Sequence, residues 1–214
     1  DCLRVGREIQ VVEGECGEDF QRFHLKGVYG NHYDLEIKLR GIHQLENAAA
    51  AFGLAKSLED KTRLKVSPEA VRDGLAQARW PGRLEKISES IKIVLDGAHN
   101  ADSALRMMDG IKRHFRYSDL IVVLGVSQDK DLAGILRQIL PEAGCLIATQ
   151  AAHPRAMDAR QIARQAEMFG ADKEIFVEAD VKTALEKAKF LADASDLILV
   201  TGSLFLVADV KRLV

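Results

Sequence analysis

The chain has 214 residues, 47% of them apolar and 29% charged, which is enough for one or two globular domains with buried cores. Its 30 basic and 32 acidic residues leave a formal net charge of −2, which excludes a broadly basic nucleic-acid binder and an acidic disordered tail. No apolar run reaches the roughly 18 residues of a membrane helix, and no secretory leader pattern opens the chain. Because the first residue is Asp1, we expect a piece of a longer protein.

The three cysteines are odd in number and far apart along the chain, at positions 2, 16 and 145. This argues against a disulfide framework and predicts a reducing, cytoplasmic setting.

The first 80 residues combine strand patterns with helix patterns. Ile9 to Val12 is an apolar run with β-branched residues, and Tyr33 to Leu39 alternates apolar and polar residues as a half-buried antiparallel strand does. Residues 44–57 are rich in alanine and predict a helix. A shorter helix should follow Ser67, which stands at the N-cap position before a proline.

The clearest break in the chain is Trp80-Pro81-Gly82. Proline disfavours a helical conformation in the residue before it, and glycine permits a sharp change of direction. We therefore expect one unit over residues 1–79, a hinge at 80–82 and a second unit over 83–214.

Beyond the break, apolar runs alternate with amphipathic helix patterns. The predicted strands are 91–95, 120–124, 145–148, 175–177 and 197–200. The predicted buried helix faces comprise Leu105, Met108, Ile111 and Phe115, then Leu132, Ile135, Leu136 and Ile139, and then Val181, Ala184, Leu185 and Ala188. Asp131, Asp158 and Asp180 stand at N-cap positions, as does Asn100. Wholly apolar strands alternating with helices predict an α/β fold, a doubly wound and mostly parallel sheet of the Rossmann-like kind.

Polar residues follow each apolar run, where an open parallel sheet binds its ligands. These segments are Asp96 to Asn100, Gly125 to Asp131, Thr149 to Arg155 and Thr201 to Ser203. Acid, histidine and cations on one edge suit a polyanionic or zwitterionic small molecule. The chain has no G-x-x-x-x-G-K-[ST] loop, no G-x-G-x-x-G fingerprint and no zinc-ligand spacing.

Three motifs carry a resemblance to a known family. They are Gly41-Ile42-His43-Gln44-Leu45-Glu46-Asn47-Ala48, Trp80-Pro81-Gly82-Arg83-Leu84-Glu85 and Leu95-Asp96-Gly97-Ala98-His99-Asn100. In this order and spacing the chain resembles the C-terminal half of folylpolyglutamate synthase/dihydrofolate synthase, in the Mur-type ligase superfamily. The resemblance implies that residues 1–79 end a central ATPase domain and that 83–214 form the C-terminal glutamate ligase domain.

The resemblance also implies roles for individual residues. Asn47 would contact the adenine, Arg83 the ATP phosphates and Asp96 the ribose hydroxyls, with His99 beside the nucleotide. Arg83 and His99 are the implied catalytic residues. Lys130 and Ser203 would bind the incoming L-glutamate. Phe205 stands where we expect tyrosine in many relatives, so a hydrogen bond made there by a hydroxyl is in doubt.

The implied reaction is ATP-dependent amide formation. The γ-carboxylate of a folate, or the carboxylate of dihydropteroate, would become an acyl phosphate, and the amine of L-glutamate would displace phosphate. Such chemistry relies on positioning and charge neutralisation. The phosphate loop and the Mg²⁺ ligands would lie upstream of this chain, so the chain alone should be inactive. We expect small-molecule partners only, no nucleic acid, no membrane and a monomer.

Two other interpretations stay open. One is a sibling Mur-type ligase acting on a cell-wall precursor; the His43-Gln44 pair and the Thr201–Phe205 segment favour the folate branch, but the region that reads the substrate lies outside this chain. A stand-alone flavodoxin-like binding or regulatory module would also fit residues 83–214, because a fold does not fix a function, but it leaves residues 1–79 and the Trp80–Glu85 motif unexplained.

Overall fold

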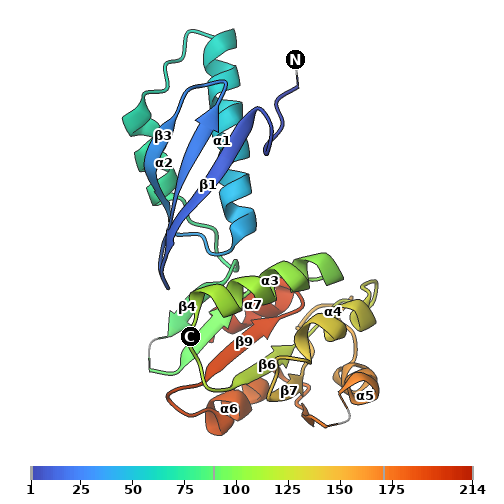
Figure 1. The fold of residues 1–214 in the computed structure, drawn as a ribbon. Coiled ribbons are helices and arrows are strands. Elements are labelled where there is room, and N and C mark those ends of the chain that lie inside the picture. Colours follow the sequence, from blue (N-terminus) through green and yellow to red (C-terminus); the bar gives the residue numbers. More distant parts are fainter. Residues whose placement is uncertain (1, 89, 171, 214) are drawn as a thin grey trace. The chain divides into compact units, whose positions relative to one another are not determined.

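The computed structural model describes residues 2–88, 90–170 and 172–213. The chain divides into two compact units (Figure 1). The first extends to Trp80 and also includes residues 113–115, and the second comprises Pro81 to Lys112 and the chain from Arg116 onward.

The sheet of the first unit has three antiparallel strands in the order β1-β2-β3. They are β1 (Ile9–Cys16), β2 (Gln21–Gly27) and β3 (His32–Ile37). The central strand β2 was not among the predicted strands, although Phe23 and Leu25 alternate with more exposed residues and are fully buried. Phe23 lies opposite Leu35 of β3, which places both side chains on the same face of the sheet.

Two helices complete the core of this unit, and both were predicted. They are α1 (Ile42–Lys61) and α2 (Pro68–Gln77). Ser67 caps α2 by accepting a hydrogen bond from the Ala70 amide at 3.2 Å. Leu45, Ala49 and Phe52 of α1 pack with the buried strand residues in one apolar cluster.

The second unit contains a six-stranded sheet in the order β4-β5-β9-β6-β7-β8. Its strands are β4 (Glu85–Ser88), β5 (Lys92–Leu95), β6 (Leu120–Leu124), β7 (Cys145–Ala148), β8 (Glu174–Val177) and β9 (Leu197–Thr201). The five predicted strands are parallel, and the unpredicted β4 pairs antiparallel with β5 at one edge. Every residue of β6, β7 and β9 is buried, as a sheet covered on both faces requires.

Among the described residues, five helices cover this sheet: α3 (Ala101–His114), α4 (Leu132–Ile139), α5 (Ala159–Phe169), α6 (Val181–Leu191) and α7 (Leu204–Lys211). The apolar sides of α6 and α7 pack on one face, against residues such as Ile121, Ile198 and Val200. The other face carries α3, where Thr201 Oγ1 lies 3.2 Å from Met107 Sδ, together with α4 and α5 (Figure 1). The predicted doubly wound, mostly parallel fold is confirmed.

The helix predictions are confirmed except at one residue. Asp131, Asp158 and Asp180 each cap a helix through backbone N–H groups. Leu105, predicted on the buried face of α3, is 46% exposed, so that prediction is wrong. The buried stripe runs through Ala104, Met107, Met108 and Ile111, and Leu105 is rotated about 100° away from Ala104 on the helix.

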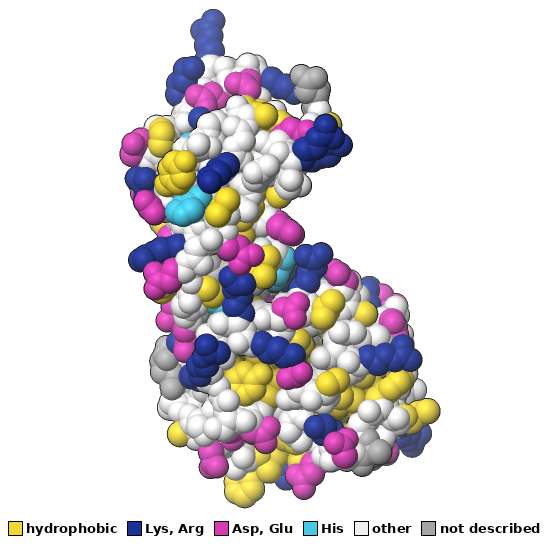
Figure 2. Space-filling view, in the orientation of Figure 1, with side chains coloured by type: hydrophobic (Ala, Val, Ile, Leu, Met, Phe, Trp, Pro, Cys, Tyr) yellow, Lys and Arg dark blue, Asp and Glu magenta, His cyan; other side chains and the backbone are white. Residues whose placement is uncertain are grey.

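Basic and acidic side chains are interspersed over the face shown in Figure 2. Among the helices of the described chain, none combines the length and the apolar character needed to cross a membrane.

Candidate active site

Asp96 is held in the turn that follows β5. Its side chain is 6% exposed, and its two carboxylate oxygens accept hydrogen bonds from backbone amides, Leu84 N at 2.9 Å and Ala98 N at 2.8 Å. Burial raises the pKa of Asp96 above its ordinary value, and the two amide donors and the charge of Arg83 oppose that rise. Asp96 is therefore a buried carboxylate that already orders the backbone around it.

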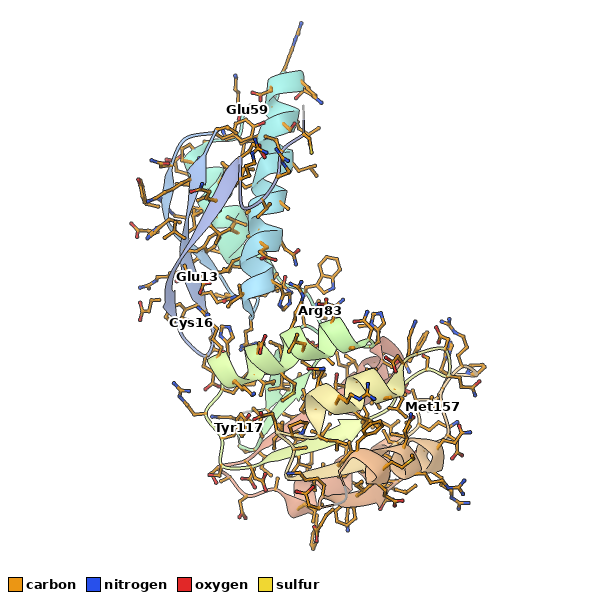
Figure 3. The ribbon with its side chains drawn as sticks, turned by 45° about the vertical axis from the view of Figure 1, so that its right-hand side comes forward. Glu13, Cys16, Glu59, Arg83, Tyr117 and Met157 are labelled. Carbon is orange, nitrogen blue, oxygen red and sulfur yellow. The ribbon has the colours of Figure 1, made fainter. Side chains whose placement is uncertain are left out.

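Arg83, which Figure 3 labels, lies beside this turn. Its two neighbours in the chain, Gly82 and Leu84, both have positive φ. Its guanidinium Nη1 lies 3.5 Å from the point where a Cβ on Gly97 would be, and that Cβ would also collide with the Leu204 side chain. No hydrogen bond or ion pair of this guanidinium is found among residues 2–88, 90–170 and 172–213, although its charge acts on Asp96. A half-buried cation of this kind is available to bind an anionic ligand.

His99 follows Asp96 in the same turn. Its Nδ1 lies 2.9 Å from the Gly97 carbonyl oxygen. Because a carbonyl can only accept, Nδ1 carries the proton, and Nε2 of the neutral ring is left as an acceptor. The predicted N-cap Asn100 is confirmed, since its Oδ1 accepts from Ser103 N at 2.8 Å. The fold thus brings Arg83, Asp96 and His99 together.

Asn47 lies in the first unit, in the second turn of α1, and its side chain is exposed. Its Nδ2 donates to Gln44 Oε1 at 3.1 Å, and Gln44 Nε2 lies 3.0 Å from His43 Nε2. Gly41, with φ of 100°, precedes α1 without any side-chain cap. The motif from Gly41 to Ala48 therefore places three polar side chains around the start of one helix.

Lys130 and Ser203 follow β6 and β9, at the same edge of the parallel sheet as Asp96. Lys130 pairs with Asp129, their Nζ and Oδ2 atoms 2.8 Å apart, and this contact holds the pKa of Asp129 below its ordinary value. Ser203 is 5% exposed and caps α7 by accepting from Phe205 N at 3.1 Å. The cap uses the Ser203 oxygen as an acceptor, which leaves its hydroxyl proton to donate.

An aromatic stack that was not predicted lies on this edge. The rings of His153 and Phe205 are 3.6 Å apart between centroids and nearly parallel, and the Arg155 guanidinium lies 5.7 Å from the Phe205 centroid. The loops after β6 and β7 are also joined, because Gln128 N donates to Arg155 O at 2.8 Å. The contacts of Phe205 with His153 and Arg155 are made by its aromatic ring, and neither contact requires the hydroxyl group of a tyrosine.

The described residues contain no group of three or more His, Cys, Asp or Glu side chains that could hold a metal ion. Asp96 therefore belongs to no cluster of metal ligands within the part of the chain that the structure describes.

The fold and this edge define a doubly wound α/β domain that presents a buried acid, two histidines and several cations beyond the carboxyl ends of its strands. Residues 82–204 match the family described as Mur ligase, glutamate ligase domain. Since this match covers more than half of the chain, the chain belongs to that family.

Relatives with known names match over both units. The chain is 32% identical over 212 residues to a folylpolyglutamate synthase of Lacticaseibacillus casei, which covers 98% of this chain and 47% of that protein. A solved structure of the Mycobacterium tuberculosis folylpolyglutamate synthase complexed with ADP superposes with a TM-score of 0.88 at 28% identity, covering 98% of this chain and 48% of that one. The chain spans about half the length of these relatives.

A ligase with a different name matches over a shorter stretch. The UDP-N-acetylmuramoyl-L-alanyl-D-glutamate–L-lysine ligase of Streptococcus agalactiae is 40% identical over 124 residues, which are 54% of this chain and 24% of that protein.

Proposed function

We propose that this chain is the C-terminal half of a cytoplasmic, monomeric ligase that uses ATP to add L-glutamate to the γ-carboxylate of a folate or to dihydropteroate. Residues 1–79 would end its central ATPase domain, 80–82 would be the hinge, and 83–214 would be the glutamate ligase domain. Its substrates are small molecules, and neither nucleic acid nor a membrane takes part.

The reaction activates a carboxylate that is otherwise a poor acylating agent. A carboxylate oxygen of the folate attacks the γ-phosphorus of ATP, ADP leaves, and an acyl phosphate forms. The amine of L-glutamate then attacks the acyl carbon, the C–O bond to phosphate breaks, and the nitrogen loses a proton as the amide forms. The protein contributes by holding the reactants in line and by neutralising phosphate charge.

The observation that supports this proposal is the environment of the Arg83 side chain. Its guanidinium is half-buried beside a glycine turn, and within the described residues it has no hydrogen-bonding partner. A guanidinium can bind two phosphate oxygens at once and stays charged at all physiological pH values. Arg83 is thus suited to contact the ATP phosphates and to stabilise negative charge during phosphoryl transfer.

Three further residues are proposed to bind the nucleotide, Asp96 and His99 in the second unit and Asn47 in the first. Asp96 has one amide donor on each oxygen, so each oxygen keeps a lone pair for a ribose hydroxyl. His99 offers its Nε2 atom as a hydrogen-bond acceptor near the nucleotide, because its Nδ1 faces the Gly97 carbonyl. Asn47 supplies the amide donor and acceptor that an adenine edge requires.

Lys130 and Ser203 are proposed to bind L-glutamate. Lys130 would exchange its contact with Asp129 for a substrate carboxylate, and the hydroxyl proton of Ser203 would donate to the same molecule. Both residues lie beyond parallel strands, where ligands of such sheets bind.

The residues present do not fit a resident Mg²⁺ ion, because the described part of the chain has no cluster of metal ligands. We therefore assign no step to a metal held by this chain, and we place the ligands of the ATP-bound Mg²⁺ in the other half of the enzyme.

The extent of similarity favours a folate substrate over a cell-wall precursor. The folylpolyglutamate synthase match extends over 98% of the chain, including the first unit, whereas the cell-wall ligase match covers 54%.

The test uses the complete enzyme, by which we mean this chain joined to the rest of the protein from which we propose it comes. We expect ADP release that requires both a folate or dihydropteroate and L-glutamate. ADP release with a UDP-muramoyl peptide and not with a folate would contradict the proposal. As a control, the 214-residue chain alone should show no turnover and only weak ATP binding by calorimetry, since it has no phosphate-binding loop.

A further inference from the structure

The backbone around Arg83 adopts an unusual conformation. Gly82 has φ of 71° and Leu84 has φ of 43°, so both neighbours of Arg83 lie in the left-handed region. Leu84 is one of two described non-glycine residues with positive φ, and its side chain is 1% exposed. Because a left-handed conformation is unfavourable for leucine, other contacts must hold it. We call residues 82–84 the Arg83 turn.

Two carboxylates hold the Arg83 turn, one at each end. Glu85 Oε2 accepts from Gly82 N at 2.7 Å, and Asp96 Oδ2 accepts from Leu84 N at 2.9 Å. A third bond, from Gly97 N to Gly82 O at 2.9 Å, ties the same turn to the loop after β5. Hydrogen bonds from backbone amides to carboxylates are charge-assisted and therefore strong.

Glu85 has a second partner. Its Oε1 accepts from Lys211 Nζ of α7 at 2.6 Å, so one carboxylate joins the Arg83 turn to the last helix of the fold. Glu85 is the last residue of the Trp80–Glu85 motif. Its two carboxylate oxygens are bonded to Gly82 N and Lys211 Nζ, so the proposed reaction gives Glu85 no direct contact with a substrate.

We propose that Glu85 is a positioning residue for Arg83: its carboxylate accepts from the amide of Gly82, while Leu84 N donates to Asp96 at the other end of the turn, and the two bonds together set the direction of the Arg83 side chain. This rests on the proposed function in one respect, that Arg83 binds phosphate. Without the Glu85 bond, the amide of Gly82 loses its acceptor and only the bond from Gly97 N to Gly82 O still holds this residue, so Gly82 shifts and the guanidinium moves with it. Displacing a substrate-binding group by about 1 Å can lower activity by on the order of 100-fold.

A plain surface ion pair with Lys211 is the competing explanation, and variants separate the two. Glu85→Ala removes both bonds, Glu85→Gln keeps an oxygen that can accept from Gly82 N, and Lys211→Met removes only the ion pair. In the complete enzyme we expect Glu85→Ala to lower kcat/KM for ATP by roughly 10- to 100-fold. Glu85→Gln and Lys211→Met should stay within about threefold of the wild type, as loss of an exposed ion pair implies.

Two further measurements make the outcomes distinct. In an Arg83→Ala background, Glu85→Ala should cause no additional loss of kcat/KM, since it acts through Arg83. In the 214-residue chain, hydrogen exchange at the Gly82 amide should be faster in Glu85→Ala and unchanged in Lys211→Met.

Equal effects of Glu85→Ala and Lys211→Met on kcat/KM, a full additional loss in the Arg83→Ala background, or unchanged exchange at Gly82 would each overturn the positioning role. Unchanged kcat/KM in the Arg83→Ala enzyme would instead overturn the proposed function. In that case, hydrogen exchange at the Gly82 amide would still show whether Glu85 holds this amide.

Discussion

Gly202 precedes the Ser203 cap at the end of β9, and the structure predicts a large effect of replacing it with alanine. Its φ is 104°, and a Cβ at this position would lie 2.7 Å from the Gly125 carbonyl oxygen, 2.8 Å from Val126 Cγ1 and 2.9 Å from Leu124 Cδ1. The backbone oxygen cannot move away as a flexible side chain can. The conformation costs alanine about 1–2 kcal/mol and the overpacking costs about 1–3 kcal/mol, so Gly202→Ala should lower the free energy of unfolding by about 2–5 kcal/mol.

The assay is urea unfolding of the 214-residue chain followed by circular dichroism, with hydrogen exchange of the β9 amides as the local readout. Gly74→Ala is the matched control, because Gly74 is exposed within α2 and nothing lies within 4 Å of its Cβ position. That variant should be more stable than the wild type by roughly 0.5–1 kcal/mol. A Gly202→Ala chain as stable as the wild type, with unchanged exchange in β9, would refute the close approach of the loops after β6 and β9.

Two other predictions concern Asp96 and Phe205. Since burial raises the pKa of Asp96, the folded chain binds more protons than the unfolded chain from about pH 3.8 up to the raised value. The stability advantage of the wild type over Asp96→Asn should therefore fall as pH rises through that window and stay constant above it; an advantage that grows with pH in urea titrations would contradict the burial argument. Phe205→Ala should lose about 0.5–1.5 kcal/mol of stacking on His153 and raise KM for L-glutamate, whereas Phe205→Tyr should match the wild type in both. Equal values for the two variants would show that the ring stack is irrelevant.

The sequence was sufficient to predict the central parallel strands β6, β7 and β9 because their burial on both faces makes them continuous apolar runs. The sequence was also sufficient to predict the buried faces of α4 and α6, because the apolar residues of both helices recur at helical spacing. The edge strand β4 was not predicted, because all four of its residues are only half-buried and its sequence, Glu85 to Ser88, contains a single apolar residue. Leu105 was assigned to the buried face of α3 because it shares the helical spacing of Met108 and Ile111. Ala104 and Met107 are also apolar and fit the same helical spacing, and they occupy the buried face instead.

The candidate site was partly predictable. The position of Asp96 after an apolar run placed it at the ligand-binding edge, and the resemblance gave Arg83 its role. The two bonds that hold the Arg83 turn could not be predicted, because they depend on positive φ at Gly82 and Leu84, which the sequence pattern does not reveal. The ion pair of Glu85 with Lys211 was also beyond prediction, because these residues are 126 positions apart. The stack of His153 on Phe205 was missed for the same reason, since single sequences do not reveal which loops meet.

The most direct test of the central claim, that Arg83 binds the ATP phosphates, is to measure kcat for Arg83→Ala in the complete enzyme alongside its free energy of unfolding. We expect kcat to fall by on the order of 100-fold or more, as for the loss of a group that stabilises transition-state charge, while stability changes by less than about 0.5 kcal/mol. An unchanged kcat, or a loss of activity that simply follows a loss of stability, would contradict the account.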